Sequence, residues 1–130
     1  MRNDNELIGF FSLCSDAVID ASASEKETLM APAIKIYMLA IDKKFQRKKI
    51  TISNLDITYA HLLLDGCISI IQNITSKEIG ATFITVNSTK EGINLYKKLN
   101  FESVDTYDAK LLADDTEEKL TPMIRFIYEI

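Results

Sequence analysis

The sequence predicts an α/β domain in which two main helices pack on a mixed sheet of about five strands. Two observations favour this class. The run at residues 34–41 is almost wholly apolar and rich in β-branched and aromatic residues, which is typical of a central strand buried on both faces. A helical pattern and a second β-branched run follow it, and this order predicts a right-handed crossover between parallel strands. The 130 residues are expected to form a single domain, 1–130, with its own core.

The remaining strands are predicted from short apolar or alternating runs. Residues 7–13 are expected to form the first strand and to pair antiparallel with the central strand across a polar connection at residues 16–31. Residues 81–86 alternate and follow a turn at Gly80, and the acidic residues within 105–121 indicate a loop. The expected strands are residues 7–13, 34–41, 81–86, 101–104 and 123–130.

The first helix is predicted to begin at Ser53. Asp56 stands three residues later, which is a variant of the capping box. Apolar residues then recur at steps of three and four as far as about Thr75, and they give one long apolar stripe. The sole histidine, His61, lies within one turn of this stripe, and we interpret it as a boundary residue of the helix rather than a general base.

The second helix is predicted over residues 90–99, where the apolar positions fall on one face. Ser88 or Thr89 can cap its first turn through a side-chain oxygen. Asn100 follows the last turn. It is expected to stop the helix in the left-handed conformation, which glycine adopts most readily and asparagine next.

Five positive charges follow the central strand within seven residues of a chain whose net charge is −4. They are Lys43, Lys44, Arg47, Lys48 and Lys49. In sheets covered by helices, ligands bind at the carboxyl ends of such strands, and a helix that starts after the loop favours anions at its N-terminus. The cluster indicates either an anion site or a solvated basic loop, and composition alone leaves both open.

Composition restricts the possible partners and the compartment. The acidic balance argues against nucleic acid as a partner. No apolar run approaches the ~20 residues of a membrane span and the start does not resemble a signal peptide, so we expect a cytoplasmic protein without membrane contact. Cys14 and Cys67 lack the spacing of metal or redox motifs and are interpreted as thiols, so no metal site is predicted.

Two motifs resemble those of a known family. An aspartate, an aromatic residue and Gln46 follow the central strand, which resembles the fourth strand and pyrophosphate-binding loop of the GCN5-related N-acetyltransferases (GNATs). The sequence GINLYKKLNF at residues 92–101 is similar to the A-x-x-F-Y-x-x-x-G-F helix of that family. The resemblance covers about residues 7–130. It implies a GNAT-like fold that lacks the usual N-terminal strand and helices, because only six residues precede Leu7.

The resemblance implies acetyl-CoA as acetyl donor and transfer to an amine of an unknown acceptor. In the family, backbone groups of the central strand hold the pantetheine, and a loop of the form [RQ]-x-x-G-x-[GA] holds the pyrophosphate. Gln46 matches the first loop position, whereas Lys49 and Thr51 replace the glycines. Arg47, Lys48 and Lys49 can supply charge in place of amides. The cofactor-binding residues that the resemblance implies are Leu39, Ala40, Ile41, Gln46, Arg47, Lys48, Lys49, Ile50 and Thr89.

Tyr96 matches the family tyrosine whose hydroxyl faces the thioester sulfur and can return a proton to the departing thiolate. The alternative is a core aromatic, because Ile93, Tyr96 and Leu99 share one helix face. Thr89 falls where the family often has an asparagine that touches the cofactor, and Asn87 is a near neighbour. The alternative for both is a cap or turn residue.

Two classes of function remain open at this point. One is an N-acetyltransferase, and the other is a catalytically inactive relative that serves as a binding or interaction module, which the replaced glycines and missing N-terminal elements suggest. Those missing helices line the acceptor side of the cleft in the family, and without them a strand edge is uncovered. Because an uncovered edge invites pairing with another chain, we expect a homodimer or a partner chain that covers the N-terminal strand edge.

Overall fold

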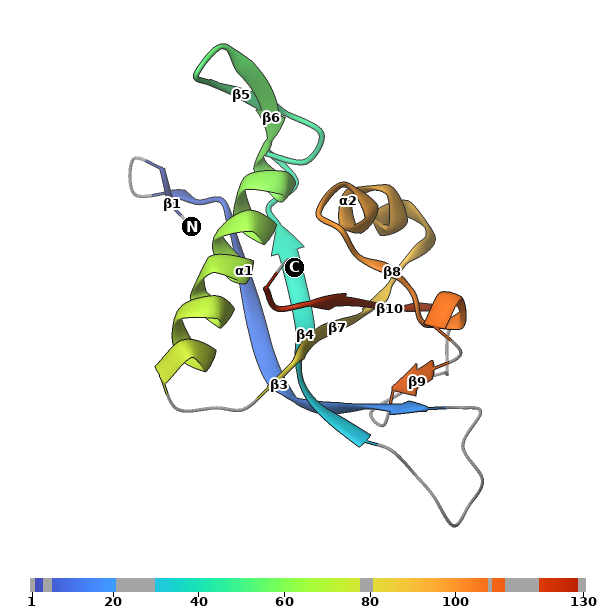
Figure 1. Cartoon of the computed structure of the whole chain (residues 1–130). Coiled ribbons are helices and arrows are strands. Elements are labelled where there is room, and N and C mark those ends of the chain that lie inside the picture. Colours follow the sequence, from blue (N-terminus) through green and yellow to red (C-terminus); the bar gives the residue numbers. More distant parts are fainter. Residues whose placement is uncertain are drawn as a thin grey trace.

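The computed structural model describes residues 2–3, 6–20, 30–77, 81–107, 109–111 and 120–128 (Figure 1). The strands are β1 (Arg2–Asn3), β2 (Glu6–Leu7), β3 (Gly9–Asp20), β4 (Met30–Ile41), β5 (Lys49–Ile52), β6 (Leu55–Thr58), β7 (Phe83–Ser88), β8 (Glu102–Ser103), β9 (Ala109–Leu111) and β10 (Thr121–Phe126). The α-helices are α1 (Tyr59–Lys77) and α2 (Ile93–Lys98), and the 3-10 turns are η1 (Lys90–Gly92) and η2 (Val104–Tyr107).

Six strands form one mixed sheet in the order β8-β10-β7-β4-β3-β9. β4 lies near its centre, parallel to β7 and antiparallel to β3. The predicted mixed sheet with two main helices is therefore confirmed. The sixth strand is β9, three residues that pair with the end of β3. It falls in the segment expected to be an acidic loop, of which residues 112–119 lie outside the described part of the chain.

β3 and β4 are longer than the sequence indicated. The predicted connection began at residue 16, yet β3 continues to residue 20 and β4 starts at residue 30. Ala17 and Val18 pair with β4 and are buried, which explains why the strand continues through them. Residues 21–29 of the predicted connection lie outside the described residues.

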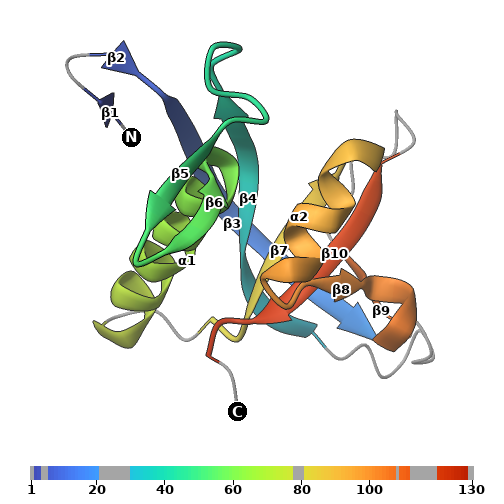
Figure 2. The same ribbon diagram turned by 90° about the horizontal axis from the view of Figure 1, so that it is seen from above.

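A bulge in β4 shapes the centre of the sheet. The register between β3 and β4 shifts after Ser12 and leaves Tyr37 without a partner on β3. One extra residue bends a strand and increases its local twist. The parallel pairing of β4 with β7 ends at the same point, at Ile36 and Val86. Beyond it the two strands diverge, and Figure 2 shows this opening from above.

Both α-helices pack on one face of the sheet and share one core with β4, β7 and β10. This core consists of Ile34, Ile36, Leu64, Cys67, Ile68, Ile71, Ile84, Val86, Tyr96, Leu99, Phe101, Met123 and Ile127. The opposite face of the sheet carries a smaller cluster, formed by Val18, Ala33, Val104 and Ile124. Neither described helix combines the length and the apolar character that a membrane crossing needs.

The prediction that the first helix begins at Ser53 is wrong. β5 and β6 form a hairpin there, and Ser53 and Asn54 occupy its turn with φ values of 51° and 65°, both positive as in a type I′ turn. α1 begins at Tyr59, where Thr58 Oγ1 accepts a hydrogen bond of 3.1 Å from the His61 N–H and caps the first turn. Figure 1 shows the hairpin projecting away from the sheet beyond the start of α1.

Candidate active site

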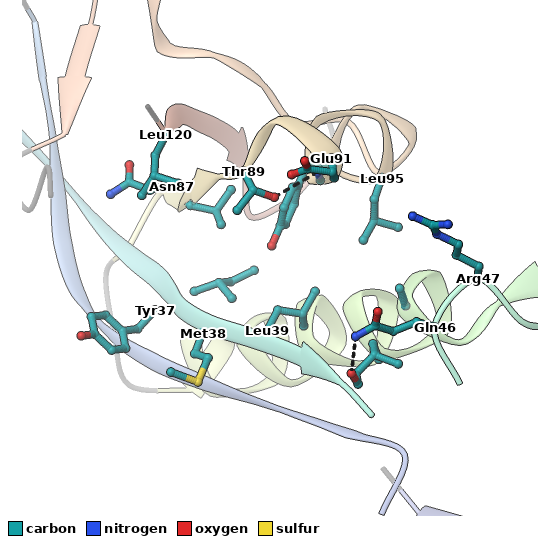
Figure 3. Close-up of a pocket in the computed structure, with 16 residues that line it drawn as sticks. Tyr37, Met38, Leu39, Gln46, Arg47, Asn87, Thr89, Glu91, Leu95 and Leu120 are labelled. Atoms are coloured by element: carbon teal, nitrogen blue, oxygen red, sulfur yellow. Dashed lines mark hydrogen bonds between the residues drawn. The ribbon is translucent and has the colours of Figure 1, made fainter. Parts of the chain in front are cut away.

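A cavity of about 630 Å³ opens where β4 diverges from β7 (Figure 3). Small-molecule sites in proteins have volumes of this order. The walls come from β4, the loop after it, the start of α1, the end of β7 and the turn into α2. The lining residues are Ile36, Tyr37, Met38, Leu39, Ile41, Gln46, Arg47, Ala60, Val86, Asn87, Thr89, Glu91, Gly92, Leu95, Tyr96 and Leu120.

The β4 wall offers backbone groups as well as side chains. β3 pairs with one edge of β4 as far as Ile41, whereas the pairing with β7 on the other edge ends at Ile36. Among the described strands, none replaces β7 on that edge, so its N–H and C=O groups can pair with an extended ligand. Leu39 and Ile41 line the cavity as the resemblance implied, whereas the side chain of Ala40 is not part of the wall.

The end of α2 fixes the position of Tyr96. The Asn100 N–H donates to the Lys97 C=O at 3.2 Å, and the Phe101 N–H donates to the Tyr96 C=O at 3.0 Å, which are the two bonds of a Schellman motif. Asn100 has a φ of 70°, so the predicted left-handed stop is confirmed. The Phe101 ring packs edge-on against the Tyr96 ring with centroids 5.3 Å apart, an apolar contact typical of this motif.

Tyr96 belongs to the core and to the cavity wall at once. Its side chain is only 7% exposed, yet it lines the cavity. Burial, and to a smaller extent the nearby Cys67, raises the pKa of the Tyr96 hydroxyl to about 12. Within the described part of the chain this hydroxyl has no hydrogen-bond partner. It therefore stays protonated at neutral pH and can donate a hydrogen bond to a ligand.

The loop after β4 folds into a compact turn that presents Gln46 and Arg47. Asp42 Oδ1 accepts a hydrogen bond of 2.9 Å from the Lys44 N–H, and Gln46 Nε2 donates to the Ile41 C=O at 3.0 Å. Arg47 has a φ of 63°, a left-handed conformation that costs a residue with a Cβ about 1 kcal/mol. Both Gln46 and Arg47 line the cavity, and Figure 3 shows them together at one end of it.

The other cofactor residues implied for this segment lie outside the cavity wall. Lys48 ends the turn and is exposed, and Lys49 and Ile50 form the start of β5, where they pair with Thr58 and Ile57 of β6. None of Lys48, Lys49 and Ile50 is among the lining residues. The fold thus brings one part of the basic segment to the cavity and directs the rest into the hairpin.

Thr89 caps the turn into α2 and also lines the cavity. Its Oγ1 accepts a hydrogen bond of 3.3 Å from the Gly92 N–H and caps η1, so the predicted cap is confirmed. The same residue lines the cavity. Gly92 allows the turn to approach β7 closely, because a Cβ there would stand 2.9 Å from Ser88 Oγ and 3.4 Å from the Tyr96 ring.

Sequence reasoning missed several parts of the wall, among them Tyr37, Met38 and Leu120. Tyr37 and Met38 lie at the bulge in β4, which no local sequence pattern marks. Asn87 was considered as a neighbour of the cofactor position, with a cap or turn residue as the alternative; it lies within β7 and lines the cavity. The alternation of β7 is the signal that identifies its face, because Asn87 shares it with Thr85 rather than with the core residue Val86.

Solved structures of bacterial toxins have a similar fold. One, described as a bacterial toxin, matches with a TM-score of 0.66 and 16% identity, over 94% of this chain and 61% of that chain. A tyrosine-to-phenylalanine mutant of the toxin AtaT, bound to acetyl-CoA and to the C-terminus of the antitoxin AtaR, matches with a TM-score of 0.58 and 14% identity, over 92% of this chain and 59% of that chain. No protein-family model and no curated protein matches the sequence.

A third similar structure is the KacTA–DNA complex, with a TM-score of 0.57 and 15% identity, over 92% of this chain and 58% of that chain. These toxins share the GNAT fold. This chain has the GNAT fold as well. The resemblance found in the sequence is therefore confirmed for the fold. The chain spans about three fifths of the length of these toxin structures.

Proposed function

We propose that this chain is an N-acetyltransferase that moves an acetyl group from acetyl-CoA to an amine. One observation carries the proposal: the cavity between the diverging strands has Gln46 and Arg47 at one end and the buried, protonated hydroxyl of Tyr96 on its wall. A thioester donor that carries a diphosphate needs a cationic end, an extended channel and a proton donor for the leaving sulfur. The AtaT structure with bound acetyl-CoA, which has the same fold, supports the proposal.

The carboxyl half of β4 is suited to the pantetheine arm. Its free edge begins where the pairing with β7 ends, after Ile36. Pantetheine carries amide groups that can pair with this edge as an added strand does. The side chains of Leu39 and Ile41 make the adjoining wall apolar, and Ala40 is proposed to contribute through its backbone. This arrangement orients the thioester along β4.

Gln46 and Arg47 are proposed to hold the diphosphate. The guanidinium offers charge-assisted hydrogen bonds, roughly twice as strong as neutral ones, in place of the amides that a glycine loop would supply. Lys48 and Lys49 are exposed beside this end of the cavity and add positive potential, while Ile50 supports the start of β5. Because exposed charges are screened by salt, we expect the affinity for acetyl-CoA to fall as the ionic strength rises.

Tyr96 is proposed to protonate the sulfur as the thiolate departs. A thiol in water has a pKa of about 8.5, which makes its thiolate a weak base toward a phenol whose pKa is about 12. Exclusion of water disfavours an anion and therefore raises the pKa of a thiol. The proposal requires that the bound coenzyme excludes water from its sulfur, so that the departing thiolate becomes basic enough to take the proton of Tyr96.

A second chain is proposed to cover the outer edge of β3. β9 pairs with that edge only at residues 18–20, and no other described strand pairs with it. Leu7 and Phe10, just before and within the uncovered stretch, are 51% and 47% exposed. The occupant is a second copy or a partner chain, and the antitoxin in the AtaT–AtaR structure is a precedent for a partner. A light-scattering mass of one protomer at micromolar concentration argues against the second copy.

The proposal also concerns nucleic acid as a partner. The acidic balance of the chain argued against it, but similar toxins occur in complexes with DNA. One of those complexes contains the toxin AtaT with its antitoxin AtaR on DNA, and the other is the KacTA–DNA complex. We therefore propose that this chain does not bind DNA by itself, and a gel-shift experiment on the isolated chain tests this point.

Calorimetric titration with acetyl-CoA tests the proposed function. We expect one binding site per chain and weaker binding at high salt. A second measurement follows free thiol as acetyl-CoA and primary amines are mixed with the protein, with heat-denatured protein as the control. Absence of binding heat at millimolar acetyl-CoA would contradict the transferase and would favour the inactive interaction module that the replaced glycines suggested.

A further inference from the structure

The β5–β6 hairpin is a two-stranded sheet of its own, and its two faces differ in chemistry. Directly paired residues of neighbouring strands share a face, and successive residues alternate between faces. One face therefore carries the apolar side chains of Ile50, Ile52, Leu55 and Ile57. The other face carries the polar side chains of Lys49, Thr51, Asp56 and Thr58. On the polar face the Thr51 hydroxyl donates a 2.8 Å hydrogen bond to Asp56 Oδ1.

The apolar face of the hairpin is open toward its tip. Ile52 is 38% exposed and Leu55 is 64% exposed, while Ile50 and Ile57 nearer the base are partly buried. Figure 1 shows why, since the hairpin extends away from the main sheet past the start of α1. A two-stranded hairpin by itself is at best marginally stable in water, and a third strand or a helix on its apolar face stabilises it. The hairpin is therefore suited to bind a further segment.

Both ends of the hairpin are held in place. At the base, the Tyr59 N–H donates a 3.3 Å hydrogen bond to the Lys48 C=O, and the rings of Phe45 and Tyr59 meet edge-on with centroids 5.1 Å apart. At the tip, Ser53 and Asn54 close the turn in left-handed conformations. A preformed surface loses less conformational freedom when a partner binds, which favours affinity.

The outer edge of β5 offers backbone groups to such a partner. Among the described strands, only β6 pairs with β5. The N–H and C=O groups on the other edge can therefore take up an added strand. The side chains of an added strand would alternate between the two faces of the hairpin. Those on the apolar face would lie beside Ile50 and Ile52, and those on the polar face beside Lys49 and Thr51.

The charge at this edge is positive. Lys48 directly precedes β5 and Lys49 is its first residue, and both side chains are exposed. Neither lysine lines the cavity at the end of β4. Opposite charges on neighbouring strands attract, and like charges repel. An acidic side chain of an added strand would therefore be favoured on the polar face beside Lys49.

We propose that β5 binds an extended segment of another protein in which apolar and acidic side chains alternate. The segment adds to the hairpin as a third strand. Its apolar side chains cover Ile50 and Ile52, and its acidic side chains face Lys49 and Lys48. No hairpin residue of β5 or β6 lines the cavity, so this docking site does not depend on the proposed acetyl transfer.

A second copy of the chain matches this edge less well. Its own β5 presents Lys49 and Thr51 on the polar face and so brings no negative charge. Its β6 carries Asp56, but pairing β5 with β6 of the next copy is a head-to-tail contact, which leaves a free edge and does not close a dimer. Packing two apolar faces against each other would leave the lysines without opposite charges. The acidic segment satisfies the backbone edge, the apolar face and the charge together.

Fluorescence anisotropy with labelled peptides tests the proposal. The probe is a hexapeptide that alternates valine and glutamate, and the reference peptide alternates valine and lysine. We expect saturable binding of the glutamate peptide, at least tenfold tighter than binding of the lysine peptide. A glutamate peptide methylated at every backbone nitrogen should lose the binding, because it cannot donate hydrogen bonds to β5. Equal affinity for all three peptides, or no saturable binding of the glutamate peptide, would overturn the proposal.

Two substitutions locate the contact on the hairpin. Ile52→Thr keeps a β-branched residue but reduces the apolar face, and it should weaken binding of the glutamate peptide about fivefold. Ile70→Thr is the matched control, since Ile70 is 46% exposed on α1, and it should have no effect. Lys49→Glu should weaken binding about tenfold, whereas Lys97→Glu on the exposed side of α2 should change it less than twofold.

A charge exchange separates a direct contact from a damaged hairpin. Lys49→Glu should bind the valine–lysine peptide more tightly than the wild-type protein does, which an unfolded hairpin could not do. Absence of this gain overturns the assignment to β5, as does unchanged binding of the glutamate peptide by Ile52→Thr. Sedimentation of both proteins covers the other occupant. A wild-type dimer that dissociates in Ile52→Thr would make the second copy the partner and would also overturn the proposal.

Discussion

Two regions of the molecule face the same cavity and behave differently: the turn into α2 and its end, residues 89–101, and the loop and hairpin at residues 42–58. Both follow strands of the sheet and both resemble motifs of the GNAT family. In the first region the cap at Thr89 and the left-handed stop at Asn100 form as the sequence predicts, while the helix predicted over residues 90–99 begins with the 3-10 turn Lys90–Gly92 and is α-helical at Ile93–Lys98. In the second, a hairpin replaces the expected start of the helix, and Gln46 and Arg47 remain as the loop residues at the cavity.

The comparison shows that the position of Tyr96 depends on local sequence, whereas an anion site made of backbone amides does not. The Tyr96 position is set by hydrogen bonds between residues three or five apart and by the contact with the Phe101 ring. Such a motif forms wherever the residue at the left-handed position permits it. An anion site made of backbone amides instead needs one particular path of the whole loop. Lys49 stands where the family has a glycine, and it pairs with Thr58 in the hairpin. Under the proposed function, charged side chains supply what the amides do not.

Removal of the Tyr96 hydroxyl should have the largest effect. Tyr96→Phe keeps the ring and its packing on Phe101 but removes the proton donor, so turnover should fall by about 100-fold or more while the Kd for acetyl-CoA stays within twofold. Tyr128→Phe, whose hydroxyl donates to the Gln72 C=O far from the cavity, is the control. Rapid-quench and calorimetric measurements give the two quantities, and an unaltered rate would remove Tyr96 from the mechanism.

The same hydroxyl makes a prediction about pH. Because its pKa is about 12, Tyr96 keeps its proton at pH 6–10, so the rate should rise with pH as the acceptor amine loses its proton and show no decline from Tyr96 below about pH 11. A pH profile of wild type and Tyr96→Phe should give curves of the same shape at different height. A descending limb between pH 8 and 10 that disappears in Tyr96→Phe would contradict the raised pKa.

Substitution of Asn100 tests the Schellman motif at the end of α2 and should have a smaller effect on turnover than Tyr96→Phe. Asn100→Ala places alanine, which adopts the left-handed conformation less readily than asparagine, at a φ of 70°. We expect the free energy of unfolding to fall by about 1 kcal/mol. Turnover should be several-fold lower, because Tyr96 shifts with the helix end. Asn100→Gly should keep both quantities at least at the wild-type level. Equal stability of the alanine and glycine variants in urea titrations would show that the Schellman motif does not control the site.

Arg47 tests the loop with the smallest effect. Arg47→Gly relieves the left-handed conformation, so stability should stay equal or rise, but loss of this exposed charge should weaken acetyl-CoA binding about threefold at low salt. Arg47→Lys keeps the charge and should retain most of the affinity. Calorimetry at two ionic strengths separates the variants, since the difference between them should shrink at high salt. Stronger binding by the glycine variant would mean that backbone amides, not the guanidinium, hold the diphosphate.

The sequence predicts the central strand, the crossover and the end of α2 well, because each leaves a local pattern. Ile34 and Ile36 are buried in the core under the helices, and their strand lies between β3 and β7. The apolar stripe of α1 includes the buried residues Leu64 and Ile71. Asn100 stands where only a few residue types are tolerated. Each of these elements is specified by burial or by one backbone conformation, and both restrict the choice of amino acid.

Two features of the site were not predictable in the same way. Ser53 and Asp56 satisfy a capping pattern, but the alternation of Ile50, Ile52, Leu55 and Ile57 with polar residues also fits two short strands, and the hairpin prevails. The bulge at Tyr37 leaves no local pattern at all, since it results from the register of β3 against β4. Tyr37 and Met38 therefore could be assigned to the cavity wall only from the three-dimensional structure.

A crystal structure of the chain with acetyl-CoA tests the central claim most directly. The thioester sulfur should lie within hydrogen-bond distance of the Tyr96 hydroxyl, the pantetheine along β4 beyond Ile36, and the diphosphate against Gln46 and Arg47. An empty cavity at saturating acetyl-CoA, or a diphosphate held on the β5–β6 hairpin with the sulfur away from Tyr96, would contradict it.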